Sequence, residues 1–503
     1  MPPSAADEVD PQTTSRQGSL LGRLLSESAI YGLGGISNQA LAVILVPIYA
    51  NVLGVSNYGI LAVVSTTLSL ATMVVTLALP QAFFRSYLKE AESEADREAV
   101  LRTALGLRLL ASFAGLLLLL LLAVPLARLI FGDLQQITVI FLIGPIVFFD
   151  TLNLVPLSLL RGERRPGAYA ALSFARALVG GVLIVILVVV ARLGVLGVLV
   201  GSAIGAMVVA SVGMVILARG HQLRIGLDGA LARHMLAFSL PLVPASVAGW
   251  TLNLSDRYVI QAFRGHNAVG VYSAGYTIGL LINALAIAPF TLAWGAAYWE
   301  ISRAPGAERQ ISRVMTAFAA FACLIALALS CLATDVLRLL FRPEYGPGRF
   351  VVPFSAFAYV CYGLYSIGAT GLNLASKTRW LPVTLGISAL ANIALNLLLV
   401  PAIGYMGAAV STLVCYALLA VLSGMISQRY YPVPWDLPRT IGAFLLALGL
   451  AAAALLGPDH VAWRVGCLIA YPALVVLLRI VSIQDVAVVV RSVLRQRASA
   501  ENG

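Results

Sequence analysis

The sequence predicts an all-α polytopic membrane protein with about 14 transmembrane helices, built as two parallel six-helix repeats plus two extra C-terminal helices. Three observations predict this class. Of the 503 residues, 60% are hydrophobic and 11% are charged, whereas about 25% are charged in typical soluble domains. Apolar stretches of about 20 residues, the length that crosses about 30 Å of hydrocarbon, recur from the residue twenties to about residue 480. Short motifs also recur after about 210 residues, which indicates two copies of one unit.

The apolar stretches define the expected helices, because inside lipid a helix hydrogen-bonds all of its own backbone groups. Their spans are 26–50, 57–84, 101–125, 136–159, 167–190, 194–217, 235–260, 269–296, 311–333, 350–374, 380–401, 405–427, 438–457 and 461–480. The polar first 20 residues contain no apolar core of a signal peptide. The expected organisation is a disordered cytoplasmic tail (1–25), two six-helix lobes (26–220 and 221–430), helices 13 and 14 (431–482) and a basic cytoplasmic tail (483–503).

The distribution of basic residues predicts the orientation in the membrane. If the N-terminus is cytoplasmic, 23 of the 33 Lys and Arg residues fall in cytoplasmic segments and 8 in outside segments. The other two, Arg108 and Arg176, lie inside expected helices. Since Lys and Arg near helix ends decide orientation, we expect a multi-pass protein of the cytoplasmic (inner) membrane with both termini in the cytoplasm. The net charge of +11 is then a sign of topology, and we expect no nucleic-acid partner.

The internal repeat begins with two glycine pairs of equal spacing. Gly54 and Gly59 follow the first expected helix, and Gly265 and Gly270 follow the seventh. Further matches keep the same order at shifts of 208 to 210 residues: Pro80 with Pro289, Arg128–Phe131 with Arg338–Phe341, Pro145 with Pro353, and Gly194 and Gly197 with Gly404 and Gly407. Six helices separate the copies, so both halves insert in the same orientation and can enclose a cleft between them.

The first hairpin carries a family resemblance. Its Leu53-Gly54 and Tyr58-Gly59 pairs resemble the turn after the first helix in the polysaccharide transporter family of the MOP exporter superfamily, which contains lipid-linked oligosaccharide flippases. The resemblance extends loosely over residues 20–490. It implies a MOP-type fold, a polyprenyl-diphosphate-linked glycan as substrate, alternating access, and a role in cell-surface polysaccharide biosynthesis. It also implies contact of helices 13 and 14 with membrane lipid, coupling to H+ or Na+, and glycosyltransferases and a polymerase of the same pathway as partners.

Polar residues in corresponding helices indicate a hydrated interior. The first expected helix carries Tyr31, Asn38 and Gln39, and the seventh carries Asn253 and the Asp256-Arg257 pair. That pair also resembles an acidic-basic pair near the end of the seventh helix in this family. Hydrogen bonding between helices, or an ion pair that reaches the interface, is the alternative and needs no ligand.

The ends of the second and eighth helices provide the other candidate substrate contacts. Pro80 and Pro289 break these helices and free backbone groups that a cavity can accommodate. Arg85, five residues after Pro80, is the first choice for contact with a lipid diphosphate, because a guanidinium forms paired hydrogen bonds with such oxygens; anchoring at the cytoplasmic interface is the alternative. Trp294 and Tyr298 can stack on sugar rings or belong to an interfacial aromatic belt. Beside them, Glu300 is a candidate for coupling to an ion.

Three charged residues within expected helices need protein or water around them, because a charge in the bilayer costs about 2.5 kcal/mol or more. Arg108 can extend along its helix to the cytoplasmic interface. Asp150 and Arg176 lie nearer mid-span, and a pair between them would explain both without a substrate.

The sequence lacks the motifs of several functional classes. The sequence contains no P-loop and no H-E-x-x-H motif, and its four histidines and five cysteines show no metal-binding spacing, so we expect no cofactor and no metal. The longest expected outside connection, 334–349, is short for a polysaccharide polymerase or ligase, so we do not expect an enzyme. The main alternative is a cation-coupled multidrug or small-molecule antiporter of the same superfamily. Those proteins tend to carry a carboxylate within the first helix, where this chain has Glu27 at the edge.

Overall fold

The computed structural model describes residues 45–132, 134–220 and 225–480. Within these ranges the chain is helical and contains no strand, and eleven helical stretches are long and apolar enough to cross a membrane. The predicted all-α membrane class is confirmed. Most of the first expected helix, both tails, and Tyr31, Asn38 and Gln39 lie outside the described residues.

The described chain forms two compact units. Unit 1 contains residues 45–49, 71–124 and 137–242, and unit 2 contains residues 50–70, 125–136 and 243–480. The helical stretch Leu45–Glu90 passes from one unit to the other, as does the helix α4 (Ala123–Phe131).

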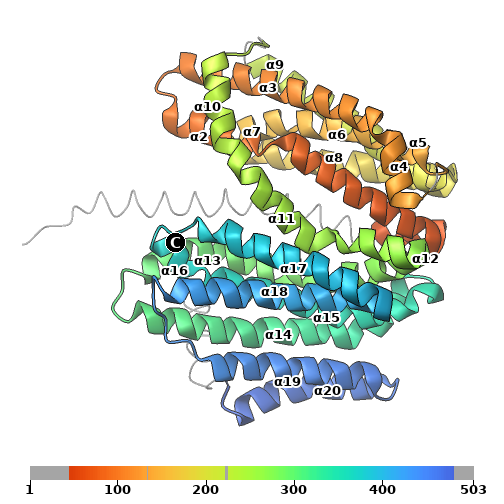
Figure 1. Ribbon diagram of the computed structural model, residues 1–503, viewed down its shortest axis with the longest axis vertical. Coiled ribbons are helices and arrows are strands. Elements are labelled where there is room, and N and C mark those ends of the chain that lie inside the picture. Colours follow the sequence, from red (N-terminus) through yellow and green to blue (C-terminus); the bar gives the residue numbers. More distant parts are fainter. Residues whose placement is uncertain (1–44, 133, 221–224, 481–503) are drawn as a thin grey trace, which may run out of the picture. The chain divides into compact units, whose positions relative to one another are not determined.

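Unit 1 is a bundle of long apolar helices joined by shorter ones. In Figure 1, α3, α6, α8 and α9 run alongside one another, with α3 packed on α6, α6 on α9 and α9 on α8. The Ser93 side chain and Asp96 form a capping box at the start of α3, which satisfies backbone N–H groups that the helix leaves free. The helices of this unit are α2 (Leu79–Arg85), the π-helix η1 (Ser86–Glu90), α3 (Glu94–Leu121), α5 (Ile137–Phe141), α6 (Ile143–Leu152), α7 (Leu154–Gly162), α8 (Pro166–Val185), η2 (Ile186–Val190), α9 (Gly194–Gly220), α10 (Gly229–Ser239) and η3 (Leu240–Leu242).

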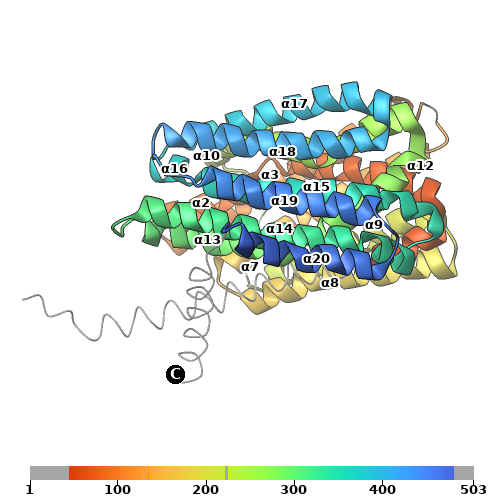
Figure 2. The same ribbon diagram turned by 90° about the horizontal axis from the view of Figure 1, so that it is seen from below.

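Unit 2 contains the second set of helices and the C-terminal pair. Figure 1 shows α17, α18, α15 and α14 in succession, and Figure 2 shows α19 and α20 alongside α14. Its helices are α11 (Val243–Leu254), α12 (Asp256–Gly279), η4 (Asn283–Ile287), α13 (Ala288–Ile301), α14 (Ala307–Leu340), η5 (Pro343–Phe350), α15 (Val351–Gly368), α16 (Thr370–Leu374), α17 (Trp380–Ile403), α18 (Tyr405–Gln428), α19 (Leu437–Leu456) and α20 (Val461–Leu477).

An ion-pair network joins α20 to α14. The buried Arg464 donates to Asp335 at 2.9 Å and to Asp459 at 2.8 Å, and Asp459 also accepts from Arg338 at 2.7 Å. The hydrogen bond from Arg338 lowers the pKa of Asp459, which lies in the loop between α19 and α20. The network therefore ties the end of α14 to α20 and holds the C-terminal pair against α14.

The two glycine pairs of the predicted repeat pack against each other within unit 2. Gly54 and Gly265 both adopt left-handed backbone angles, with φ of 74° and 75°, which a glycine accommodates without steric cost. A Cβ at Gly59 would overlap the carbonyl oxygen of His266, and a Cβ at Gly270 would overlap that of Val55. His266 directly follows Gly265, and Val55 directly follows Gly54. Each close contact is therefore made by the residue after the first glycine of the other pair. This reciprocity supports the sequence repeat.

Helix boundaries differ from the expected ones mainly at polar ends. The ninth expected span, 311–333, is part of the longer α14, because charged residues at its ends extend the helix beyond the apolar stretch. The seventh expected span, 235–260, covers parts of α10, α11 and α12, because the chain breaks at Pro241 and again at Ser255. The second break places the Asp256-Arg257 pair at the start of a new helix.

Candidate functional site

A buried ion pair of unit 2 lies at the junction of α11 and α12. Asp256 is 1% exposed and Arg257 is 7% exposed. The Asp256 carboxylate accepts a hydrogen bond from Arg257 at 3.1 Å and a short one from the Tyr272 hydroxyl. The guanidinium also donates to the carbonyl of Asn253 at 3.2 Å and lies 4.8 Å from the centre of the Tyr276 ring. The pair is thus neutralised inside the protein and does not extend to the interface.

Asn253 links this ion pair to two further tyrosines. Its side-chain oxygen accepts hydrogen bonds from the hydroxyls of Tyr359 on α15 and Tyr416 on α18, each at 2.7 Å. Its amide nitrogen donates to the carbonyl of Gly249, one turn earlier on α11. With all three bonds made, Asn253 serves as a hydrogen-bonding centre that joins α11, α15 and α18. This matches the predicted alternative of hydrogen bonding between helices.

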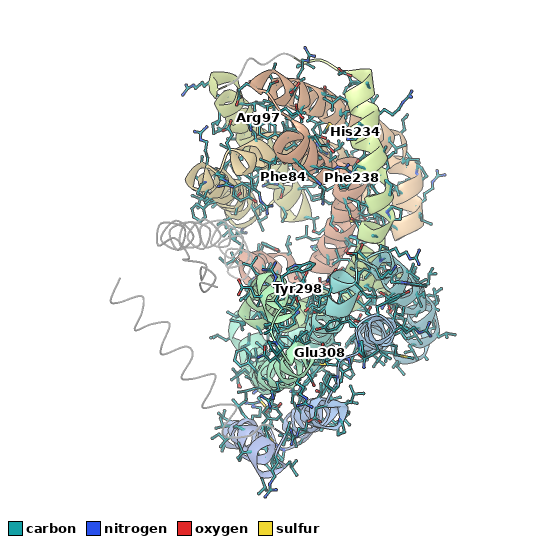
Figure 3. The ribbon with its side chains drawn as sticks, turned by 90° about the vertical axis from the view of Figure 1, so that its left-hand side faces the viewer. Phe84, Arg97, His234, Phe238, Tyr298 and Glu308 are labelled. Atoms are coloured by element: carbon teal, nitrogen blue, oxygen red, sulfur yellow. The ribbon has the colours of Figure 1, made fainter. Side chains whose placement is uncertain are left out.

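In unit 1, Arg85 belongs to a polar cluster with α10. Its Nε donates to Glu90 at 2.7 Å, and its guanidinium lies 4.7 Å from the centre of the Phe238 ring. The second oxygen of Glu90 is 3.1 Å from Nε2 of His234 and also accepts from Ser86. Figure 3 shows His234 and Phe238 following one another along α10. Arg85 is still 42% exposed, so one edge of its guanidinium remains accessible to an anion.

The helix that carries Arg85 is broken just before Pro80. Leu77 and Ala78 both have φ of 51°, a left-handed conformation that costs residues other than glycine about 1–3 kcal/mol each. Pro80 has no N–H to offer the carbonyl of Thr76 four residues earlier. In the second half, the π-helix η4 precedes Pro289. The break at Pro80 is present, whereas at Pro289 the helix continues through a π-helical turn and is not interrupted.

Arg108 provides the hydrogen bonds that this break removes. Its Nη1 donates to the carbonyl of Thr76 at 3.2 Å and lies 3.5 Å from that of Val75. The side chain is 2% exposed, so the expectation that it extends to the interface was wrong. The orphaned carbonyls of the break explain the difference, because they solvate the guanidinium inside the bundle.

Asp150 and Arg176 form the predicted pair between α6 and α8. Arg176 binds both carboxylate oxygens, with Nε at 2.7 Å and Nη2 at 3.1 Å. This two-point geometry is the strongest that a guanidinium and a carboxylate can adopt. The pairing is confirmed, and it accounts for both charges without a ligand.

The aromatic candidates of α13 are placed differently from one another. Trp294 is buried and its indole N–H donates to Thr370 at 3.0 Å, so in this structure its ring is engaged in packing. Tyr298 (labelled in Figure 3) is half-buried. Its ring lies 5.1 Å from that of the exposed Trp299. Glu300 is exposed at the end of α13. Among the described residues, no group of three or more His, Cys, Asp or Glu side chains is placed to hold a metal ion.

The comparisons with known proteins identify the family. The model of the family described as "Polysaccharide biosynthesis protein" matches residues 24–294, more than half of the chain. The chain belongs to this family. A stretch of 224 residues is also 22% identical to an uncharacterized membrane protein of Methanocaldococcus jannaschii, and the match covers 43% of this chain and 44% of that protein. The chain therefore aligns with less than half the length of that relative.

Solved structures show the fold of this member of the family. It is similar to the lipid II flippase MurJ in an inward closed conformation, with a TM-score of 0.72 and 14% identity over 93% of this chain and all of that one. It is also similar to an inward-facing multidrug resistance MATE family transporter of the MOP superfamily, with a TM-score of 0.61 and 17% identity over 78% of this chain and 94% of that one. The predicted MOP-type fold is confirmed.

Sequence reasoning missed the tyrosines and the partners of Arg85. Tyr272 and Tyr276 are four residues apart on α12 and face the Asp256-Arg257 pair. That spacing places both on one helix face, and it was the available signal. Glu90 and His234 are 144 residues apart, so no local pattern could have joined them.

Proposed function

We propose that this protein is a flippase that moves a polyprenyl-diphosphate-linked oligosaccharide across the cytoplasmic membrane by alternating access, for cell-surface polysaccharide biosynthesis. The family match supports a role in polysaccharide biosynthesis, and the fold is one on which membrane transporters are built. The charge distribution along the sequence supports an inner-membrane location with both termini in the cytoplasm.

The observation that carries the proposal is the match to a polysaccharide biosynthesis family on a transporter-type fold, and the polar network around Asn253 gives a candidate place for the transport path. A buried ion pair and several tyrosine hydroxyls are expensive in a membrane helix bundle and mark functional regions more often than surface charges do. The network lies at the junction of α11 and α12, where Ser255 separates the two helices while its backbone angles stay in the α-helical region. In the proposed mechanism Asp256 holds Arg257 in position, and Asn253, Asp256 and Arg257 border the path of the polar head group.

Arg85 is the proposed contact for the diphosphate. Glu90 and Phe238 fix its guanidinium from two sides while leaving part of it exposed. An exposed, oriented guanidinium can form paired hydrogen bonds with phosphate oxygens. Tyr298 is the remaining proposed sugar contact of α13, and Glu300 is the proposed group for coupling to H+ or Na+. Membrane lipid, glycosyltransferases and a polymerase remain the proposed partners.

The test is the location of the lipid-linked intermediate in cells that lack the protein. If it is a flippase, completed lipid-linked repeat units accumulate on the cytoplasmic side, and restoring the gene returns them to the outer leaflet. If it is a polymerase, single units are already exported and only chain growth stops. Export that continues unchanged in the deletion strain would overturn the proposal.

A cation-coupled multidrug antiporter is the second candidate, and the similarity to a multidrug resistance transporter favours it. Drug efflux separates the two functions. A purified protein in vesicles that moves cationic dyes in exchange for H+ or Na+ flowing down an imposed gradient, and leaves a fluorescent lipid-diphosphate glycan on its original side, would support the antiporter.

A further inference from the structure

The helix α15 is enclosed by protein along nearly its whole length and opens at a tyrosine. Of the described stretches long enough to cross a membrane, the one that contains α15 is the most buried. Within α15, all of whose residues are described, only Tyr362 is exposed, at 37%. By contrast, α17 exposes apolar side chains at nearly every turn from Val383 to Leu398, as a helix that faces lipid does. The opening at Tyr362 is not part of such an apolar stripe.

Tyrosine rings gather at this opening. The centre of the Tyr362 ring lies 5.7 Å from that of Tyr365 and 6.4 Å from that of Tyr359. These neighbours are three residues away on either side, a spacing that brings side chains together on a helix surface. The ring of Tyr416 on α18 lies 5.9 Å from that of Tyr362 and stands nearly perpendicular to it, at 85°. Two helices of unit 2 therefore supply one aromatic surface.

The hydroxyls divide the four tyrosines into two pairs. Those of Tyr359 and Tyr416 donate to the side-chain oxygen of Asn253, which fixes their rings. Those of Tyr362 and Tyr365 form no hydrogen bond with any described residue. A hydroxyl inside a membrane protein is unfavourable without a partner. The second pair is therefore free to exchange hydrogen bonds with water or with a ligand.

These groups match the chemistry of a sugar ring. A pyranose presents C–H groups on its faces, which pack on an aromatic ring, and hydroxyls at its edge, which exchange hydrogen bonds with phenol groups. We propose that Tyr362 and Tyr365 bind one sugar residue of the glycan, which stacks on the Tyr362 ring, while Tyr359 and Tyr416 hold that ring in place. The tyrosines carry no charge, so this surface suits the neutral sugar and leaves the diphosphate to Arg85. The inference rests on the proposed transport of a lipid-linked oligosaccharide.

The first test asks whether Tyr362 faces water or lipid. Membranes that contain the Tyr362→Cys protein are treated with a charged methanethiosulfonate reagent, which reacts with thiolates in water. Leu390→Cys, at an exposed apolar position of α17, is the control for lipid, and the unchanged protein, whose five cysteines are buried, gives the background. We expect fast labelling at position 362 and slow labelling at position 390. Equally slow labelling at both would place Tyr362 in lipid and overturn the proposal.

The second test separates the sugar from the rest of the substrate. Two probes are titrated onto the purified full-length protein in a detergent without sugar head groups: the lipid-linked glycan extracted from cells, and polyprenyl diphosphate that carries no sugar. Tyr362→Ala should weaken binding of the glycan probe about tenfold, the loss of one stacking contact, and should leave binding of the sugar-free probe unchanged. Tyr365→Phe, which removes only a hydroxyl, should weaken glycan binding less. Phe321→Ala, at an exposed aromatic position of α14, should bind both probes normally.

The outcomes separate this site from the proposed function. If Tyr362→Ala and Tyr365→Phe bind the glycan probe like the unchanged protein, or if Tyr362→Ala loses both probes equally, the sugar site is refuted and the flippase proposal stands. An unchanged protein that binds neither probe would overturn the proposed function, and this inference with it.

Discussion

Asp256→Asn tests whether the carboxylate is the internal counter-ion of Arg257. The substitution keeps the shape of the side chain but removes the charge that faces Arg257 at 3.1 Å. Arg257 is 7% exposed, so it would remain as a buried cation held by the Asn253 carbonyl and the Tyr276 ring. Removing one partner of a buried pair typically costs about 3–5 kcal/mol. We expect about 3 kcal/mol here, because the carbonyl and the ring compensate part of the loss.

The assay is reversible unfolding of the purified protein in mixed micelles, with Glu94→Gln as the control. Glu94 pairs with Arg97 at the surface, where an ion pair is worth about 0–1 kcal/mol, so the control should unfold like the unchanged protein. A double-mutant cycle with Arg257→Gln then isolates the pair, and we expect a coupling of about 1–3 kcal/mol. An Asp256→Asn protein within about 0.5 kcal/mol of the original, or additive effects in the cycle, would refute the assignment.

Three further predictions concern other parts of the chain. Arg85→Ala should reduce export while membrane insertion stays intact, and unchanged export in a complementation test would remove Arg85 from the site. Gly59→Ala should destabilise the protein by about 1–3 kcal/mol because its Cβ meets a backbone carbonyl; Gly386→Ala, with open space around it, should be neutral or stabilising in the same unfolding assay. Asp150→Asn should destabilise unit 1 more than the double substitution with Arg176→Gln, since the single change leaves a partly buried cation without its carboxylate; equal losses would contradict this.

Features that depend on local sequence pattern and on membrane thickness could be predicted from the sequence. The length of the apolar stretches located the helices. The equal spacing of Gly54 and Gly59 and of Gly265 and Gly270 indicated two related turns, and the structure shows that these turns contact each other. The Asp150–Arg176 pair was predictable because two opposite charges in neighbouring membrane helices have few other partners.

The rest depended on contacts between distant parts of the chain. Tyrosine in a membrane segment is usually assigned to an interface, so the hydroxyls of Tyr359 and Tyr416 on Asn253 were not expected. The left-handed pair Leu77 and Ala78 has no sequence signal, because neither residue favours positive φ. The structure shows Arg108 of the neighbouring helix α3 in contact with the two carbonyls directly before this pair.

The repeat itself indicates that Arg108 belongs to the break and not to the common bundle. Phe318 lies 210 residues after Arg108, the shift found throughout the repeat, and it is buried against Phe290 directly after Pro289. In the second copy the helix accommodates Pro289 without a break. The π-helix η4 precedes the proline, and the Ala288 N–H donates to the Asn283 carbonyl. The Phe318 ring donates no hydrogen bond there, whereas Arg108 binds two carbonyls in the first copy. The contacts of the Arg108 guanidinium with the carbonyls of Val75 and Thr76 therefore belong to the break of the first copy.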